Sequence, residues 1–202
     1  MSRFLLIRHG EYDSLGNFLA GRMDGVRLNY HGERQAAALA EPLSRMGVDA
    51  VVSSPLERAV ATAVPLAEAS GMVVETREQL TDIDYGEWTG KELKSLEGDA
   101  DWLRFNTFRG GSVPPGGESI LHVQARMVHD IFHIAELFPN GTVALFGHAD
   151  PIKTVVAHFL GIPFELMGRI SIAPASVTTL EIDRWGAQFR CLGASAQGIS
   201  AF

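Results

Sequence analysis

Short apolar runs alternate with helix-like segments along most of this chain. Four runs are short and mostly apolar, and they lie at residues 4–7, 50–52, 72–75 and 142–146. Helical patterns follow them in turn, at residues 29–46, 55–70, 118–138 and 150–160. Wholly apolar runs are typical of strands buried on both faces of a parallel sheet. The alternation therefore predicts an α/β fold with a largely parallel sheet and right-handed crossover connections.

The last part of the chain shows a different pattern. Residues 169–193 alternate between apolar and polar positions, with a turn near Trp185 and Gly186. Such alternation is typical of two or three strands joined by hairpins. We therefore expect antiparallel strands at one edge of the sheet.

A helix start is predicted at Ser54. This serine can cap a helix, Pro55 suits the first helical position, and Glu57 stands where a capping box needs an acid.

Residues 80–117 are the least regular part of the chain and allow two short helical pieces at most. Long irregular segments of compact domains often carry function, so we expect a lid or insert here. Several large side chains of this segment either select a substrate or pack beneath a loop; they are Trp102, Phe105, Phe108, Arg104 and Arg109.

The composition is that of an ordinary globular protein. The chain has 202 residues, 46% of them hydrophobic and 20% charged, so we expect a single domain over residues 1–202 with 80–117 as its lid. The single cysteine, Cys191, has no partner for a disulfide within the chain and excludes a zinc site built on cysteines. With a net charge of −7 and no basic run, the chain is a poor candidate for binding nucleic acid or an anionic membrane.

The amino-terminal residues do not resemble a targeting segment. The apolar run at 4–7 is followed at once by Arg8 and His9, and no apolar run of 18 residues occurs later. We expect a cytoplasmic protein.

Polar side chains follow three of the predicted strands. Arg8 and His9 come directly after the first strand, and His148 comes two residues after the fourth. Arg58 lies one turn into the helix that follows the second strand. Ligands of open α/β sheets bind beyond the carboxyl ends of the strands, so these side chains should meet at one edge. Two arginines and the amino ends of helices suit a tetrahedral oxyanion, above all a phosphoryl group.

The two histidines supply the reactive chemistry of such a site. A neutral imidazole can attack phosphorus and become a phosphohistidine. The second histidine, when protonated, can join the arginines around the phosphoryl oxygens. A carboxylic acid is also required, because the leaving oxygen must take up a proton.

Five sequence blocks occur in a fixed order along the chain. They are Arg8-His9-Gly10-Glu11 and the stretches SSPLERA at 53–59, DYGEWTG at 84–90, PPGGES at 114–119 and FGHA at 146–149. Together they resemble the signature of the histidine phosphatase superfamily, over about residues 3–161. The resemblance implies the phosphoglycerate mutase-like fold, a three-layer α/β/α sandwich with a mostly parallel central sheet and an antiparallel edge.

The resemblance also implies roles for individual residues. His9 resembles the nucleophile that is transiently phosphorylated. Arg8, Arg58 and His148 resemble the phosphate pocket, and His148 is counted with the catalytic residues. The proton donor of the family is usually a glutamate a few residues before the third block, where this chain has Asp82.

Other assignments stay open beside these. Glu87 and Glu11 are alternative proton donors. An asparagine of the family's phosphate pocket corresponds to Asn17, which falls about two residues late, so Ser14 is its alternative. Glu11, Arg22 and Glu87 are candidates for the substrate rim, and Arg22 suits a loop ion pair equally well.

Two further positions depart from simple expectations. The second histidine is usually followed by two glycines in the family, whereas Ala149 and Asp150 follow it here. Asp150 therefore adds negative charge beside the phosphate unless it points away or caps the helix. His129 and His133 have the helical spacing of a zinc site, but no third ligand is evident, so we interpret them as solvated histidines.

The residues and the resemblance together predict a metal-independent phosphatase that uses no cofactor and hydrolyses a small-molecule phosphomonoester through His9. One alternative is a phosphoglycerate mutase-like phosphotransferase, which returns the phosphoryl group to a bound product. A non-catalytic phospho-ligand binder is a third hypothesis. The sequence does not identify the substrate, and it leaves the oligomeric state open, a homodimer being one option.

Overall fold

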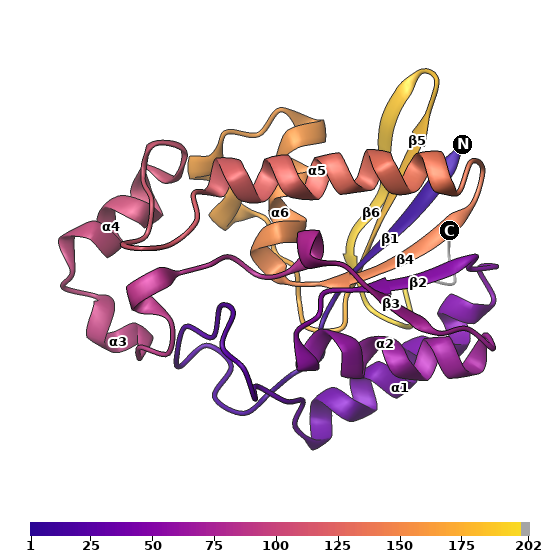
Figure 1. Cartoon of the computed structure of the whole chain (residues 1–202), viewed down its shortest axis with the longest axis horizontal. Helices are drawn as coiled ribbons and strands as arrows, with labels where there is room; N and C mark the ends of the chain where they lie inside the picture. The colour runs from indigo at the N-terminus through magenta and orange to yellow at the C-terminus, as the bar shows by residue number, and fades with distance from the viewer. Residues whose placement is uncertain (199–202) are drawn as a thin grey trace.

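A six-stranded sheet forms the centre of the computed structural model, which describes residues 1–198 (Figure 1). The strands lie in the order β3-β2-β4-β1-β5-β6. Their bounds are β1 (Ser2–Arg8), β2 (Ala50–Ser53), β3 (Val74–Thr76), β4 (Thr142–Gly147), β5 (Val177–Asp183) and β6 (Gly186–Ala194). The first four pair in parallel, whereas β5 and β6 pair antiparallel. The predicted mostly parallel sheet with an antiparallel edge is confirmed.

Helices cover both faces of this sheet, α1 and α2 on one face and α5 and α6 on the other (Figure 1). Their bounds are α1 (Tyr30–Ser44), α2 (Glu57–Ala69), α5 (Ile120–Leu137) and α6 (Ala149–Leu160). Two apolar cores result, because successive side chains of a strand point to opposite faces. In β1, Leu5 and Ile7 pack toward α1 and α2, whereas Phe4 and Leu6 pack toward α5 and α6. This is the three-layer α/β/α sandwich that the sequence predicted.

No helix within residues 1–198 combines the length and the apolar content needed to cross a bilayer. The predicted single domain also includes residues 199–202, which lie outside the described residues.

The segment at 80–117 contains the short helices α3 (Leu93–Leu96) and α4 (Ala100–Thr107) together with single 3-10 turns. Its aromatic residues pack on one another. Trp88 meets Trp102 edge to face with ring centroids 5.3 Å apart, and it meets Phe105 at 5.6 Å. Because Trp88 and Phe105 are buried in the same core as β1 and α5, Trp102 and Phe105 anchor the segment to the sandwich.

The predicted capping box at Ser54 is wrong. Helix α2 begins at Glu57, and its N-cap residue, Leu56, makes no hydrogen bond through its side chain. The Ser54 hydroxyl accepts from the N–H of Leu56 at 3.3 Å and also contacts the ring of His148, and the Glu57 carboxylate accepts from the backbone N–H of Gly25. Both side chains thus also make contacts far away in the sequence.

Two smaller differences concern strands. The strand predicted at 72–75 lies at Val74–Thr76. The carboxyl-terminal region forms two strands, because residues 164–169 make a 3-10 helix and the chain enters β5 only at Val177.

The core predicts the effect of truncating a central strand residue. Leu5 is fully buried and lies between β4 and β5, so Leu5→Ala should lower the free energy of unfolding by about 3 kcal/mol. Leu121→Ala on α5 is the matched control, because Leu121 is 54% exposed and should cost less than about 0.5 kcal/mol. Urea denaturation measures both, and equal values for the two variants would contradict this description of the core.

Candidate active site

The predicted phosphate residues meet at the carboxyl ends of β1, β2 and β4. Arg8 is the last residue of β1, and the backbone N–H of His9 donates to the carbonyl of Gly147 at the end of β4, 2.9 Å away. The rings of His9 and His148 lie 5.2 Å apart between centroids. Both histidines are buried. The parallel strands therefore bring the two histidines together from positions 139 residues apart in the sequence.

The hydrogen bonding of His9 defines its tautomer. Its Nδ1 lies 2.7 Å from the carbonyl oxygen of Gly10. A carbonyl only accepts, so Nδ1 carries the proton and Nε2 keeps its lone pair. Burial lowers the pKa of His9 well below its usual value, and the neighbouring His148 and Arg58 lower it further. His9 is thus a neutral imidazole whose Nε2 carries an available lone pair.

The turn that holds His9 is packed tightly against α1 and α2. A side chain on Gly10 would lie 2.7 Å from the carbonyl oxygen of Gly32 in α1, which is closer than a carbon can approach. The Gly10 N–H donates to the hydroxyl of Thr62 in α2 at 2.9 Å. Glycine is required here because the turn and the first turn of α1 are in direct backbone contact.

Arg58 brings a buried positive charge to the site from the first turn of α2. Its side chain is 1% exposed, and its Nη2 donates to the carbonyl of Gly21 at 2.7 Å and to Asp82 Oδ2 at 3.1 Å. Arg8 is held by a hydrogen bond from its Nη1 to the carbonyl of Ile172 at 2.7 Å. Both guanidinium groups are therefore fixed in place by protein acceptors.

Several donor atoms of the site have no protein partner. Among residues 1–198, the buried side-chain nitrogens without a hydrogen bond include Arg8 Nε, Arg58 Nε, Arg58 Nη1 and His148 Nδ1. Each such buried group left unpaired costs about 1–3 kcal/mol, so clustered examples call for an explanation. An anion rich in acceptor oxygens would satisfy these nitrogens together.

His148 contacts two other side chains. Its Nε2 lies 2.8 Å from the hydroxyl of Ser54, and its Nδ1 lies 3.6 Å from Asp82 Oδ2, beyond hydrogen-bond length. Burial lowers the pKa of His148 well below its usual value, with further lowering by Arg58, Arg126 and Arg8. The ring is therefore neutral in this arrangement. The expected protonated form requires a nearby dianion to favour it.

Asp82 is the carboxyl group beside the two histidines. Its side chain is 15% exposed, and its Oδ1 accepts from the N–H of Ile83 at 2.9 Å. Burial raises the pKa of Asp82, and this outweighs the lowering by the adjacent Arg58. A raised pKa is what a group that protonates a leaving oxygen needs.

The backbone of Asp82 is held by two arginines. Arg22 Nε and Arg126 Nη2 donate to its carbonyl oxygen at 2.9 and 3.1 Å. Both arginines also bind Glu118, the acid of the PPGGES block, at 2.8 and 2.9 Å. Arg22 thus lies in the loop ion pair, which was one of its two predicted roles. Sequence reasoning missed Arg126, because nothing in its helical surroundings points to residue 82.

The remaining predicted rim residues lie away from this cluster. Glu11 accepts from Gln35 Nε2 at 3.0 Å and pairs with His31 on α1, and Glu87 is exposed. Asn17 is exposed, and its carbonyl accepts from the N–H of Leu93 at 2.8 Å. Ser14 is likewise exposed, with its carbonyl bonded to the N–H of Asn17. The structure does not bring these side chains to the histidines, and their roles stay predictions.

Tyr12 is a site residue that sequence reasoning missed. Its ring lies 5.6 Å from the ring of His9, and the Arg58 guanidinium lies 5.8 Å from its centroid. The Tyr12 ring thus contacts both His9 and the buried cation of Arg58. Its position three residues after His9 in the sequence was the one feature that could have indicated its place in the site.

The histidines at 129 and 133 are exposed on α5. Residues 1–198 contain no cluster of three or more His, Cys, Asp or Glu side chains that could hold a metal ion. The interpretation of these two residues as solvated fits their exposure.

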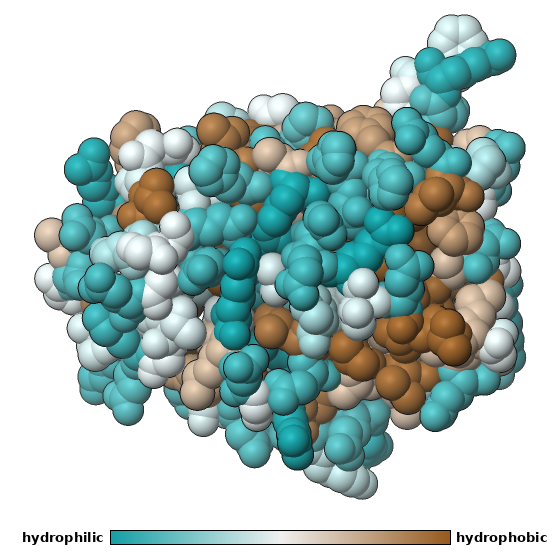
Figure 2. All heavy atoms as spheres, viewed as in Figure 1, coloured by the Kyte–Doolittle hydropathy of each residue, from teal (hydrophilic) through white to brown (hydrophobic). Residues whose placement is uncertain are grey.

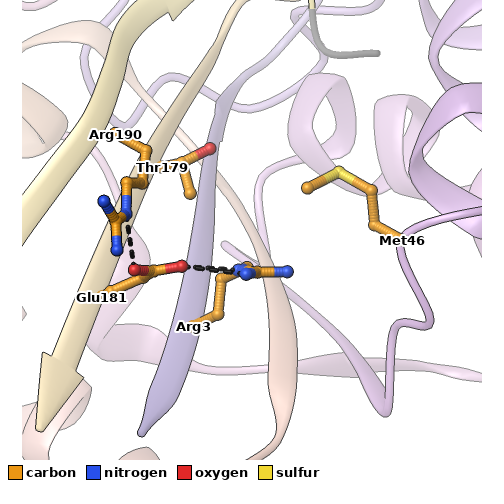
Figure 3. A pocket seen from close by; sticks show the side chains of 5 residues that line it. All are labelled: Arg3, Met46, Thr179, Glu181 and Arg190. Carbon is orange, nitrogen blue, oxygen red and sulfur yellow. Dashed lines mark hydrogen bonds and ion pairs between the residues drawn. The ribbon is translucent and has the colours of Figure 1, made fainter. Parts of the chain in front are cut away.

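A hollow of about 310 Å³ lies at the opposite end of β1, where Arg3 and Arg190 bind the carboxylate of Glu181 (Figure 3). Arg3 precedes Arg8 by five residues, roughly 17 Å along a strand. The two arginines here are both paired with Glu181, whereas Arg8 and Arg58 keep buried nitrogens that have no hydrogen-bond partner among the described residues. This hollow is therefore lined by ion pairs that join neighbouring strands, and it is separate from the histidine site.

Comparison with known families agrees with this geometry. A sequence profile of the histidine phosphatase superfamily (branch 1) matches residues 4–195. The chain belongs to this superfamily. The match extends past the five recognised blocks to the end of β6.

Known relatives in the superfamily include phosphatases. The chain is 32% identical over 174 residues to the glucosyl-3-phosphoglycerate phosphatase of Mycobacterium tuberculosis, covering 80% of this chain and 76% of that one. A structure of the mycobacterial glucosyl-3-phosphoglycerate phosphatase with inorganic phosphate has a TM-score of 0.84 at 29% identity, covering 96% and 98% of the two chains.

Some relatives are longer proteins. The chain is 32% identical over 192 residues to a bifunctional protein of M. tuberculosis, covering 92% of this chain. It spans only about half, 52%, of that protein's length.

The unpartnered donors predict how the site responds to an anion. Inorganic phosphate should bind the wild-type protein, and Arg58→Gln should weaken this binding at least about tenfold, since that factor corresponds to ~1.4 kcal/mol. Arg45→Gln is the matched control, because the Arg45 side chain is 73% exposed on the end of α1. Isothermal titration calorimetry measures both, and equal phosphate affinities in the two variants would contradict the assignment of the pocket.

The buried histidines predict a pH dependence of stability. Because burial lowers the pKa of His148 in the folded chain, the unfolded chain binds its proton more readily below about pH 6.5. The free energy of unfolding should therefore fall with decreasing pH, at a limiting slope of about 1.4 kcal/mol per pH unit where only the unfolded chain binds this proton. His148→Gln should remove that share of the slope between pH 6.5 and 5, whereas His133→Gln, at an exposed position, should retain it.

Proposed function

We propose that the chain hydrolyses a phosphomonoester through a phosphohistidine on His9. The observation that carries this proposal is the free Nε2 of a neutral His9 beside buried, unpartnered donors of Arg8, Arg58 and His148. A nucleophile and a set of anion-binding donors at one point suit phosphoryl transfer. The named phosphatase activity of the relatives supports the same reaction class.

The first step transfers the phosphoryl group to the protein. His9 Nε2 attacks phosphorus in line with the bond to the leaving oxygen, so that an N–P bond forms as the O–P bond breaks. Arg8, Arg58 and His148 hold the equatorial oxygens, where negative charge gathers. Asp82 gives its proton to the leaving oxygen, and the substrate departs as an alcohol.

The second step regenerates the enzyme. The Asp82 carboxylate takes a proton from a water molecule, whose oxygen attacks phosphorus and displaces Nε2. Inorganic phosphate leaves, and His9 and protonated Asp82 return to their starting states. No atom changes its oxidation state in either step. That the reaction needs no cofactor or metal stays a prediction from the sequence.

The substrate is a phosphate ester, which the phosphatase relatives support. We retain a small-molecule ester as the substrate and a cytoplasmic location as predictions, and a homodimer as one option for the oligomeric state. The phosphotransferase alternative differs only in the acceptor, since a bound product then replaces water in the second step.

The decisive experiment compares wild type with His9→Ala on p-nitrophenyl phosphate and a panel of small phosphomonoesters, in the presence of EDTA. Wild type should release phosphate, and kcat/KM should fall at least about a thousandfold in the variant because it has no nucleophile. His133→Ala, at an exposed histidine of α5, is the control. Rapid-quench mass spectrometry should locate a phosphate adduct on His9.

Other outcomes would overturn the proposal. Equal phosphate release by wild type and His9→Ala would exclude the phosphohistidine route. Isomerisation of phosphoglycerate that exceeds hydrolysis would establish the phosphotransferase, and phosphate binding without turnover of any ester would establish a binding protein.

A further inference from the structure

Ser54 and His148 form a buried pair at the carboxyl ends of β2 and β4. The Ser54 hydroxyl lies 2.8 Å from His148 Nε2, and the two residues are 0% and 1% exposed. The backbone N–H of Ser54 donates to the carbonyl of Phe146 in β4 at 2.8 Å. Because β2 and β4 are neighbours in the sheet, the serine that follows one strand lies beside the histidine that follows the other.

The partners of the Ser54 hydroxyl determine where its proton lies. Within residues 1–198, the hydroxyl oxygen has two hydrogen-bond partners, the N–H of Leu56 at 3.3 Å and His148 Nε2. The N–H of Leu56 can only donate, so it cannot accept the hydroxyl proton. A buried hydroxyl proton without an acceptor costs free energy. His148 Nε2 therefore accepts from Ser54, and this ring nitrogen carries no proton of its own.

The proton of a neutral His148 ring must then lie on the other nitrogen. Burial lowers the pKa of His148 well below its usual value, so the ring is neutral and has one N–H. Its Nδ1 lies 3.6 Å from Asp82 Oδ2, an oxygen that already accepts from Arg58. A lone pair on Nδ1 would face the lone pairs of this oxygen and be repelled, whereas an N–H would be attracted. Both ends of the ring thus indicate the same tautomer.

His148 and His9 are then the same tautomer, but they present opposite ends to the site. His9 uses its Nδ1 proton on the carbonyl of Gly10 and keeps a lone pair on Nε2. His148 has its Nε2 bonded to Ser54 and keeps the N–H of Nδ1, which has no partner among the described residues. The ring centroids are 5.2 Å apart. One ring therefore offers an electron pair, and the other offers a hydrogen-bond donor.

We propose that Ser54 is a positioning residue that fixes His148 as the Nδ1–H tautomer and so directs its one N–H toward the phosphoryl group. This inference rests on the proposed function for the identity of that ligand, and it adds how the second histidine is oriented before the ligand arrives. Ser54 acts through the ring of His148. A donor that is already oriented needs no change of tautomer and no rotation of the ring when the anion binds, so less of the binding free energy is lost.

NMR of the histidine ring nitrogens tests the tautomer in the wild-type protein. Protonated and unprotonated ring nitrogens resonate at different frequencies, so a long-range proton–nitrogen spectrum of protein with isotope-labelled histidine distinguishes the tautomers. The His148 signals are assigned from their loss in His148→Gln. We expect a protonated Nδ1 and an unprotonated Nε2 in the absence of phosphate. A proton on Nε2, alone or together with one on Nδ1, would overturn the inference.

Variants of Ser54 test whether its hydroxyl sets this tautomer. Ser54→Ala leaves Nε2 without a donor, so the wild-type tautomer should no longer dominate. The Kd for inorganic phosphate, measured by calorimetry, should rise about three- to tenfold, the factor expected from one ordinary hydrogen bond. Ser54→Thr retains a hydroxyl and should restore both the tautomer and the affinity.

Ser70→Ala is the matched control. Ser70 lies at the carboxyl end of α2, and its hydroxyl oxygen is buried without a hydrogen-bond partner among residues 1–198. The substitution removes the same group from a position that no ring depends on. It should change neither the tautomer of His148 nor the affinity for phosphate.

The outcomes separate this inference from the proposed function. An unchanged tautomer and an unchanged phosphate affinity in Ser54→Ala would show that the serine only packs against the ring, and the inference would fail. If Ser54→Ala does not fold, the wild-type spectrum still decides which nitrogen is protonated. If wild type has the expected tautomer and binds phosphate but hydrolyses no ester, the phosphatase function fails and the role of Ser54 stands. If wild type hydrolyses esters with the His148 proton on Nε2, only the inference fails.

Discussion

The buried guanidinium of Arg58 is the constraint around which the rest of the site is arranged. A positive charge with a 1% exposed side chain is tolerated only where acceptors surround it. Two acceptors come from separate parts of the chain, the carbonyl of Gly21 in the loop after β1 and the carboxylate of Asp82 near the start of the irregular segment. The Nε and Nη1 atoms of Arg58 have no protein partner within residues 1–198 and are therefore available to bind an anion. One cation therefore fixes two loops and leaves part of its hydrogen-bonding capacity for a ligand.

The same cation helps to position Asp82, the proposed proton donor, which stands where the resemblance predicts a longer glutamate. Asp82 reaches less far by one methylene, so its backbone must be well placed. Arg22 and Arg126 hold its carbonyl, and Glu118 holds both arginines. Arg58 fixes the carboxylate at the other end of the residue. The acid is thus positioned from both sides, and the polar groups around it are satisfied as a network.

Local patterns were sufficient to predict most of the fold and the main residues of the candidate site. Apolar runs marked the strands because these are buried on both faces, and residues that follow parallel strands must meet at one edge. That is why His9, His148 and Arg58 could be placed together from sequence alone. The helix predicted to begin at Ser54 begins at Glu57, and the Ser54 hydroxyl bonds both to the nearby N–H of Leu56 and to the distant His148, a contact that local spacing does not predict.

The contacts that sequence reasoning missed are all long-range in the chain. Arg126 and Asp82 lie 44 residues apart, and Arg109 and Asp150 lie 41 apart. The sequence indicates that Asp150 places a negative charge near the phosphate. Its contact with Arg109, however, depends on how the irregular segment packs against α6. Neither the hydrophobic periodicity nor the spacing of motifs predicts such a contact, because each partner lies on an element with its own local pattern.

The antiparallel edge of the sheet also has a consequence for where the functional unit ends. All five sequence blocks lie before residue 150, and a fragment that stopped after α6 would contain every one of them. Yet Arg8 is held by the carbonyl of Ile172, and the N–H of Ala175 donates to the carbonyls of Arg8 and His9. The segment that leads into β5 thus holds the backbone of Arg8 and His9 in place. The minimal catalytic fragment must therefore extend well beyond the last motif, and a search for functional gene fragments that relied on motif content alone would choose boundaries that are too short.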